Sequence, residues 1–360
     1  RISGFCADMP SQRGVSVAVT GLIANESPAP GVGVARSLRA QAFSGRITGL
    51  LYDALEAGAF LEGLLDHTYI IPYPSEGGED FFQRLLYIRE TSGLDVLIPT
   101  LDAELLPLIR LARRLARAEV RTFLPTAEQF QLRGKDRLYD LKTRHGLPVP
   151  RARALYDAGA VWKLRGEFEF PLFVKGVFYE AYRASCEAEA LAHFQKLQAR
   201  WGLPVVIQEA VDGEEYDVAA LGDGRGGTVG AVAMRKMQLS DKGKAWAGVT
   251  VADERLIELC RRTIAALKWR GPLELEVIKA RRDGTYHILE INPRFPAWVF
   301  LAQGAGQNLP HACLRLALGE KVAAMSTYRS GILFVRAAQD LVCPVSRLEQ
   351  ISVKGEWHAS

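Results

Sequence analysis

Short apolar strands alternate with helical segments in the first third of the chain, and this alternation restricts the fold more than any other feature. The strands are expected at 15–21, 46–53, 69–73 and 94–100. Helical patterns begin at Val34 and cover 78–92 and 103–115. Strands separated by helices of this length indicate a parallel, doubly wound α/β sheet. Ligands bind at the carboxyl edge of such a sheet, where Gly21, Asp53 and the turn 99–104 would lie.

Two glycines in the loop before the first helix resemble half of a dinucleotide-binding fingerprint. Gly31 and Gly33 lie ten or more residues beyond the first strand, and no third glycine follows at the required spacing. We interpret this segment as a loop that starts a helix. A nicotinamide-dependent dehydrogenase therefore has little support.

From Arg137 onward the pattern changes to an antiparallel α+β region. Helices are expected at 137–145, 188–200 and 255–267. Strands are expected at 171–176, 205–211, 216–221, 228–234, 273–278 and 286–291. The glycine-rich turn and the charged turn that join consecutive strands are typical of hairpins.

The segment HILEINPRFPAW, residues 287–298, places polar side chains at the end of an apparently buried strand. Glu290, Asn292 and Arg294 are two residues apart, so they share one face of an extended strand. Glu276 lies on the preceding strand, and pairing of the two strands would bring it close to Glu290 and Asn292. Oxygen ligands of this kind suit Mg²⁺. The alternative, solvated acids on a half-exposed hairpin, is weakened because the polar face continues past the strand.

Two lysines and one hinge-like segment complete the pattern. Lys135 precedes a helix, where phosphate oxygens are favoured, and Lys175 ends an apolar strand. Each lysine alone is weak evidence, because exposed lysines are common. In QEAVDGEEYDV, residues 208–218, backbone groups at a strand end could read an adenine edge, and a carboxylate could accept ribose hydroxyls. An ordinary connection with surface acids is the alternative.

The order of these features resembles the ATP-grasp superfamily, and the LEINPR segment carries the resemblance most specifically. The family includes the large subunit of carbamoyl-phosphate synthetase, biotin carboxylase and D-alanine–D-alanine ligase. The resemblance implies a parallel pre-ATP-grasp domain over 1–125 and a small lid subdomain over 126–205. It further implies a nucleotide- and metal-binding subdomain over 206–325, followed by a C-terminal extension over 326–360.

The resemblance also implies roles for individual residues. Lys135 and Lys175 would hold the ATP phosphates, Glu215 would bind the ribose, and Arg294 and Lys236 would act on the reacting groups. The adenine-binding hinge would comprise Gln208, Glu209, Ala210 and Val211. The magnesium ligands would be Glu276, Glu290 and Asn292, with Mn²⁺ as an alternative ion.

The sequence departs from the family pattern at two places. The segment GVFYEAYRA, after Lys175, lacks the usual glycine-rich loop over the phosphates, and residues 234–251 are a candidate replacement. The cations of that candidate are Arg235, Lys236, Lys242 and Lys244, although a solvated charged loop is an equal alternative. After Arg294, the FPAW segment predicts a pocket with aromatic walls. These walls would be Phe295, Trp298 and Phe300.

Together these features predict an ATP-dependent ligase that activates a carboxylate as an acyl phosphate and joins it to an amine. No Ser/His/Asp or Cys/His constellation is present, and this reaction needs no protein nucleophile. The substrates would be small-molecule or peptide acids and amines. A carboxylating enzyme of the biotin-carboxylase or carbamoyl-phosphate type, and a non-catalytic nucleotide-binding module, remain alternatives.

Composition limits the partners and the compartment. The 360 residues carry a net charge of +4 without a polybasic run, which argues against nucleic acid. No apolar run approaches the roughly 20 residues of a membrane span. No signal peptide is visible, although the chain begins with Arg1 and not with Met. The five scattered cysteines favour free thiols in a reducing cytoplasm. A homodimer is one option for assembly.

Overall fold

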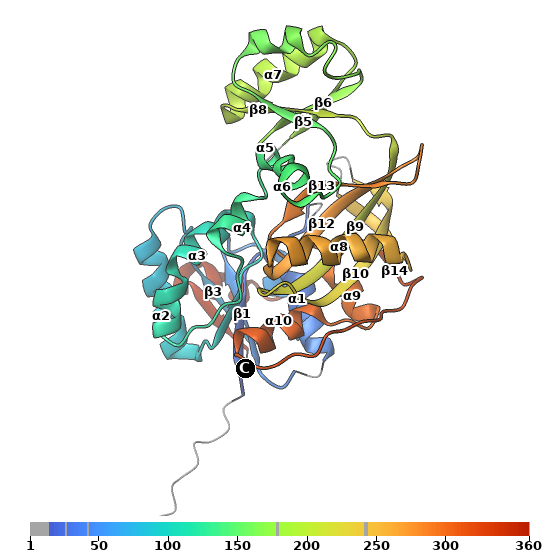
Figure 1. Cartoon of the computed structure of the whole chain (residues 1–360). Coiled ribbons are helices and arrows are strands. Elements are labelled where there is room, and N and C mark those ends of the chain that lie inside the picture. Colours follow the sequence, from blue (N-terminus) through green and yellow to red (C-terminus); the bar gives the residue numbers. More distant parts are fainter. Residues whose placement is uncertain (1–13, 26, 42, 178–179, 241–243, 360) are drawn as a thin grey trace, which may run out of the picture.

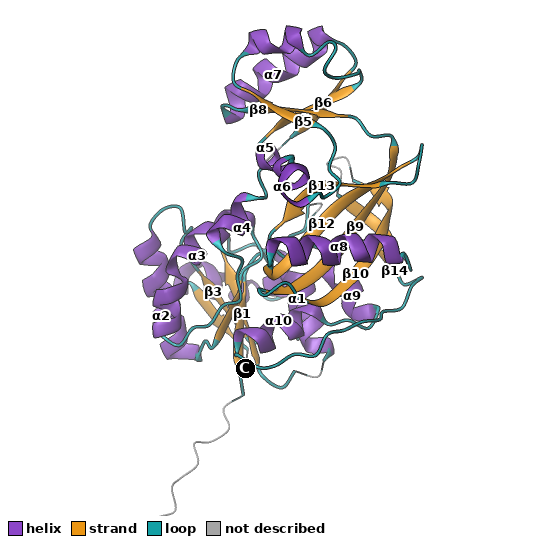
Figure 2. Ribbon diagram, in the orientation of Figure 1, coloured by secondary structure: helices purple, strands orange, loops and turns teal. Residues whose placement is uncertain are grey.

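Three sheets organise the part of the chain that the structure describes (Figure 1, Figure 2). The computed structural model describes residues 14–359 except 26, 42, 178–179 and 241–243. A four-stranded sheet and helix α7 stand apart from the other two sheets (Figure 1). The described cysteines are free thiols, as expected, and Cys6 lies outside the described residues. Within the described ranges, no helix is both long and apolar enough to cross a membrane.

The first sheet has the strand order β15-β3-β2-β1-β4. Strands β1 to β4 pair in parallel, as the alternation of strands and helices predicts. Their bounds are Ser16–Val19, Arg46–Leu51, His67–Ile70 and Val96–Ile98. The helices between and after them are α1 (Gly31–Ala40), α2 (Gly78–Ser92) and α3 (Asp102–Arg117).

Strand β1 is buried on both faces, so helices cover the first sheet from both sides. Val17 and Val19 contact a core that contains Val34 and Leu38 of α1. Ala18 faces the opposite core, to which α2 and α3 contribute. The first core also contains residues of the third part of the chain, including α9 (Val299–Gly304). The first and third parts therefore share one apolar core.

The glycine pair near residue 31 has a structural function. Helix α1 begins at Gly31, where sequence analysis expected a loop until Val34. The amide nitrogen of Gly31 donates to the carbonyl of Gly21 at 2.9 Å. A Cβ at Gly31 would lie 2.1 Å from the carbonyl oxygen of Thr20, so only glycine allows this approach.

The four-stranded sheet has the order β5-β8-β6-β7, with antiparallel pairing throughout. The strands are Ala152–Leu155, Leu172–Gly176, Ala181–Ala184 and Val205–Glu209, for β5 to β8. Helix α7 (Glu187–Trp201) covers this sheet through Phe194 and Leu197. Since β8 belongs to this sheet, the expected boundary at 205/206 cuts through a strand. The change to the next sheet comes after Glu209.

The six-stranded antiparallel sheet has the order β13-β12-β9-β10-β11-β14. Its strands are Gly213–Asp223, Thr228–Leu239, Ala245–Thr250, Arg270–Ala280, Tyr286–Asn292 and Leu333–Val335, for β9 to β14. Helix α8 (Glu254–Leu267) packs on one face. Helix α9 and helix α10 (Leu309–Ala317) belong to the core on the other face.

The C-terminal part is not a separate extension. Strand β14 pairs with β11 at one edge of the six-stranded sheet. Strand β15 (Glu356–His358) pairs antiparallel with β3 of the first sheet. Residues after 326 therefore complete two sheets, which no local sequence signal indicated.

Three short helices, α4 (Ala127–Gln131), α5 (Lys135–Leu138) and α6 (Asp140–His145), connect the first sheet to the four-stranded sheet. In α4, the Thr126 hydroxyl accepts from the amide of Gln129. The amide of Thr126 in turn donates to the side-chain oxygen of Gln129, which completes a capping box. Gly146 ends α6 in a left-handed conformation.

Glu104 ties together the carboxyl ends of β1, β2 and β4. Its carboxylate is buried and accepts hydrogen bonds from the hydroxyls of Thr20 and Tyr52. It also accepts from the amide nitrogens of Thr100 at 2.7 Å and Leu101 at 2.9 Å. Burial raises the pKa of Glu104, and these donors oppose the rise. The ligand edge of the first sheet is thus fixed by one acid.

We expect Glu104→Ala to lower the free energy of unfolding by about 2–4 kcal/mol, because several buried donors lose their acceptor. Glu104→Gln, which keeps an acceptor oxygen, should cost less. Urea denaturation measures both changes. Glu90→Ala, at an exposed helix position, is the control and should change stability by at most about 0.5 kcal/mol. If Glu104→Ala and Glu90→Ala lowered the free energy of unfolding equally, the hydrogen bonds to Glu104 would not have the stabilising role described here.

Candidate functional site

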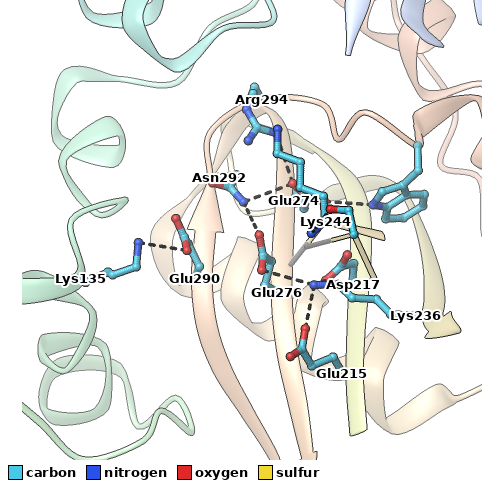
Figure 3. Close-up of polar contacts among 12 residues, drawn as sticks. Lys135, Glu215, Asp217, Lys236, Lys244, Glu274, Glu276, Glu290, Asn292 and Arg294 are labelled. Carbon is cyan, nitrogen blue, oxygen red and sulfur yellow. Dashed lines mark hydrogen bonds and ion pairs between the residues drawn. The ribbon is translucent and has the colours of Figure 1, made fainter. Parts of the chain in front are cut away.

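The pairing of β12 with β13 brings the predicted metal ligands together (Figure 3). Glu276 lies opposite Glu290, and Glu274 lies opposite Asn292. The Nδ2 of Asn292 donates to Glu276 at 2.9 Å and to Glu274 at 3.2 Å. The register shifts after Glu276, where Val277 pairs with Ile288, so Leu289 is an extra residue in β13. The polar face thus ends where the bulge begins.

Arg294 joins this polar face to the first sheet. Its Nη1 donates to Glu274 at 3.2 Å and to the carbonyl of Phe295 at 3.1 Å. Its Nε contacts Asp102, at the start of α3, at 3.4 Å. Burial alone would lower the pKa of Arg294, but Asp102 and Glu274 raise it above the ordinary value. The guanidinium is therefore held as a cation between two sheets.

Lys236 forms ion pairs with three carboxylates on strands β9 and β12. Its Nζ lies 3.0 Å from Glu215, 3.2 Å from Asp217 and 3.5 Å from Glu276. Although burial lowers the pKa of Lys236, Asp217 and Glu276 raise it overall. Burial raises the pKa of Asp217, and the ion pair with Lys236 opposes the rise. Sequence analysis missed Asp217. Glu215 and Asp217 are two residues apart on one strand, so their spacing already indicated that they share a face.

The two predicted phosphate-binding lysines lie close to the metal ligands. The Nζ of Lys135 lies 3.2 Å from Glu290, and its side chain is buried. Lys175 is buried, and its Nζ donates to the side-chain oxygen of Gln208 on the neighbouring strand β8. Burial, followed by the nearby charge of Lys135, lowers the pKa of Lys175 to about 8. Lys135 and Lys175 come from different elements, α5 and β6, and meet only in the folded chain.

The predicted hinge connects two sheets. Gln208 and Glu209 end β8, and residues 210–212 lead directly into β9. The amide nitrogen of Arg151 donates to the Glu209 carboxylate at 2.8 Å, which fixes this strand end. Ala210 and Val211 lie between the strands and are half-buried. Glu215 follows on β9, but its carboxylate is bound to Lys236.

The residues of the metal hypothesis fit a hard divalent ion that shares its ligands with phosphate. Glu276 and Glu290 supply carboxylate oxygens, and the side chain of Asn292 supplies an amide oxygen. Within the described part of the chain, no three His, Cys, Asp or Glu side chains are grouped as a metal site. The predicted set contains only two such residues, so the remaining ligands would come from phosphate and water.

A cavity of about 240 Å³ opens beside this cluster. Ile23 and residues 27–30 and 100–102 of the first part line the cavity, together with Glu274, Glu276 and Arg294. Trp298 also lines the cavity, and its Nε1 donates to Glu274 at 3.0 Å. The cavity therefore lies between the first sheet and the six-stranded sheet.

The expected aromatic walls are only partly present. Phe295 is fully buried in the shared core and does not line the cavity. Phe300 is exposed, with the guanidinium of Arg36 over its ring. Period-two alternation ends at Pro293, so positions 295 and 300 do not continue the polar face. Of the three predicted aromatic residues, Trp298 alone faces the cavity.

The segment 234–251 is a β-hairpin and not a solvated loop. Strand β10 continues to Leu239, and β11 begins at Ala245. Lys236 points to the acids described above, and Arg235 is exposed. Lys244 lines the cavity, whereas Lys242 lies outside the described residues. The segment after Lys175 forms a β6–β7 hairpin, in which residues 178–179 are outside the described part.

The chain is similar to ATP-grasp proteins in part of its sequence and in its fold. A family model described as "ATP-grasp in the biosynthetic pathway with Ter operon" matches residues 203–340. The chain is 24% identical over 159 residues to the carbamoyl phosphate synthase large chain of Thermoanaerobacter pseudethanolicus. That match covers 42% of this chain and 15% of the relative, so the chain spans a small part of that protein's length.

Solved structures agree on the fold. The biotin carboxylase domain of the 2-oxoglutarate carboxylase from Hydrogenobacter thermophilus superposes with a TM-score of 0.68 at 15% identity, covering 86% of this chain and 71% of that chain. An L-amino acid ligase from Bacillus licheniformis gives a TM-score of 0.62 at 15% identity, covering 86% and 75% of the two chains. The chain has the ATP-grasp fold, and the resemblance inferred from sequence is confirmed.

We expect Lys175 to make stability depend on pH in a defined window. Its folded pKa of about 8 lies below the value of roughly 10.4 in an unfolded chain. Between these values the unfolded chain binds more protons, so the free energy of unfolding rises with pH. Urea denaturation from pH 7 to 10 should show this rise in the wild type and not in Lys175→Met. If the free energies of unfolding of the wild type and Lys175→Met differed by the same amount at every pH, the prediction would be wrong.

Lys236→Met should lower the free energy of unfolding by about 3–5 kcal/mol in the absence of divalent ions, because it leaves carboxylates buried without a cation. Urea denaturation measures the loss. Lys279→Met is the matched control on the same sheet. Lys279 pairs with Asp253 at 3.6 Å and is one-third exposed, so its loss should not exceed about 1 kcal/mol. A similar cost for both variants would refute the role of Lys236.

Proposed function

We propose that the chain is an ATP-dependent ligase that activates a carboxylate as an acyl phosphate and joins it to an amine. One observation carries the proposal. Two buried lysines lie close to an acidic strand pair, and the half-buried Arg294 lines a cavity together with Glu274 and Glu276 of that pair. Such an arrangement neutralises the charge of a phosphoryl group in transfer, which is the main requirement of this chemistry.

Each predicted residue has a role in this proposal. Lys135 and Lys175 hold the phosphates of ATP, and the segment from Gln208 to Val211 binds the adenine. Glu215 binds the ribose, for which it must separate from Lys236. Mg²⁺ or Mn²⁺ is held by Glu276, Glu290 and Asn292, and the ion supplies positive charge to the phosphate oxygens when bound.

The reaction proceeds in two balanced steps. An oxygen of the substrate carboxylate forms a bond to the γ-phosphorus, and the bond between that phosphorus and ADP breaks. The amine nitrogen then forms a bond to the acyl carbon, phosphate leaves with its electron pair, and the amine proton passes to solvent. Arg294 and Lys236 stabilise the transferring phosphoryl group and the acyl phosphate oxygens.

A carboxylating enzyme is the second candidate. The similarity to a biotin carboxylase domain favours it, because that protein was solved with MgADP and bicarbonate. The aromatic side chain of Trp298 in the cavity wall favours the ligase, as the FPAW segment suggested. Hydrolysis of ATP that depends on bicarbonate would distinguish this candidate from the ligase.

The location of the protein in the cytoplasm and its assembly as a homodimer remain predictions from the sequence.

The decisive measurement is ADP release with Mg²⁺ and ATP across pooled carboxylic acids, with and without pooled amines. We expect turnover that needs both pools and falls at least about 100-fold in Glu290→Ala, because the metal and Lys135 lose their shared carboxylate. Glu258→Ala, an exposed acid on α8, is the control and should leave turnover unchanged.

Two results would contradict this proposal. Binding of ATP without ADP release on any pool would favour a nucleotide-binding module. Unchanged turnover in Glu290→Ala, with the variant folded by circular dichroism, would refute the metal and phosphate assignment.

A further inference from the structure

Helix α3 carries a row of exposed arginines, which we call the arginine stripe. Its members are Arg110, Arg113, Arg114 and Arg117. They are spaced by three or four residues, so their side chains lie along one face of the helix. No Asp or Glu occurs from residue 105 to residue 118. The stripe is about 10 Å long, because each residue of a helix adds 1.5 Å along the axis.

Most of the charge of the stripe has no partner in the part of the chain that the structure describes. Arg114 bonds to the Glu79 carboxylate through both Nη atoms, at 2.8 Å and 3.1 Å. The other three members form neither an ion pair nor a hydrogen bond with a described residue: Arg110, Arg113 and Arg117. The first acid after the helix, Glu119, pairs with Arg89. Three guanidinium groups are therefore available to a ligand.

The stability of α3 does not require the stripe. Like charges three or four residues apart destabilise a helix. The helix dipole favours cations in the last turn, which accounts for Arg114 and Arg117 and not for Arg110, two turns from the end. Packing of α3 depends on its opposite face, where the leucines at 105, 108, 111 and 115 are buried. A local feature that opposes stability is expected at a functional surface.

The chemistry of the stripe favours carboxylates on a helix. Each guanidinium is a planar fork that binds a carboxylate through two parallel hydrogen bonds, and clustered arginines recognise acidic motifs. An acidic helix presents side chains with the same spacing of three and four residues. Carboxylates on one face of it can therefore meet successive arginines of the stripe.

Other anionic surfaces fit the stripe less well. A basic helix that binds a membrane buries its apolar face among the lipids, whereas the apolar face of α3 is already buried in the protein core. Nucleic acids are bound by broader basic surfaces, and the net charge of this chain is only +4.

We propose that the arginine stripe is a docking surface for an acidic helix of a partner protein. This inference goes beyond the proposed ligase and does not depend on it. Helices α2 and α3 cover the face of the first sheet opposite to α1, so the six-stranded sheet leaves the stripe open (Figure 1). Helix α3 begins at Asp102, which lines the cavity, and Arg110 lies about 12 Å further along the axis. A docked partner would thus lie near the proposed active site.

Two designed peptides test the proposal. Each is about 20 residues long and rich in alanine, so that it forms a helix by itself. The matched peptide carries its glutamates on one face with the spacing of the stripe, and the scattered peptide distributes the same glutamates around the helix. Fluorescence anisotropy at low and at physiological ionic strength measures binding. We expect the wild type to bind the matched peptide at least about 10-fold more tightly, because only that peptide meets all the arginines together.

Charge reversal locates the binding surface. The double variant Arg110→Glu/Arg117→Glu should bind the matched peptide about 10-fold more weakly, since two attractions become repulsions. The matched control is Arg255→Glu/Arg262→Glu on α8. These two arginines are also exposed and seven residues apart, so the net charge changes equally. The control should bind as the wild type does, and circular dichroism shows whether both variants are folded.

Several results would overturn the docking surface. Equal affinity for the two peptides, or an equal loss in the α8 variant, would show only unspecific attraction between charges. Phosphatidylserine vesicles and duplex DNA serve as further probes. If the wild type binds either more tightly than the matched peptide, the stripe is not a surface for an acidic helix. A preference for the matched peptide that only the α3 variant loses supports the proposal, whether or not the ligase activity is found.

Discussion

The partly buried ion pairs of Arg294 are the interaction on which the rest of the site depends. This one guanidinium bonds to Glu274 on the six-stranded sheet and to Asp102 at the edge of the first sheet. Glu274 is in turn saturated by Trp298 and Asn292. Removing one partner of such a network would leave a charge buried without compensation. The network therefore links the two sheets that form the cavity, in addition to the apolar core that they share.

Each sheet supplies one component of the site. The first sheet supplies a rigid edge, which Glu104 fixes by bonding to residues after three strands. The four-stranded sheet supplies Lys175, and the connection after Glu209 leads from it to the acids of the six-stranded sheet. Because the four-stranded sheet stands apart (Figure 1), movement about this connection would change the distance between Lys175 and the acids.

The charges of the site are arranged in two regions. Around Lys236 the carboxylates outnumber the cations, which suits a divalent ion and the nucleotide it would bring. Lys244 and Arg336 also line the cavity, and neither forms an ion pair with a described residue. Arg294 lies between the two regions, where a reacting carboxylate would meet the phosphoryl group.

The sequence by itself determined the class of fold and much of the candidate site. Period-two spacing placed Glu290 and Asn292 on one face, and hairpin pairing brought them to Glu276, because these relations are local. Only the tertiary structure decided the partners of Lys236, the burial of Phe295 and the entry of the C-terminal strands into two sheets. All three features depend on contacts between residues that are distant in the sequence. Arg336 enters the cavity for the same reason: an edge strand takes its position from the sheet that it joins, and its own residues do not specify that sheet.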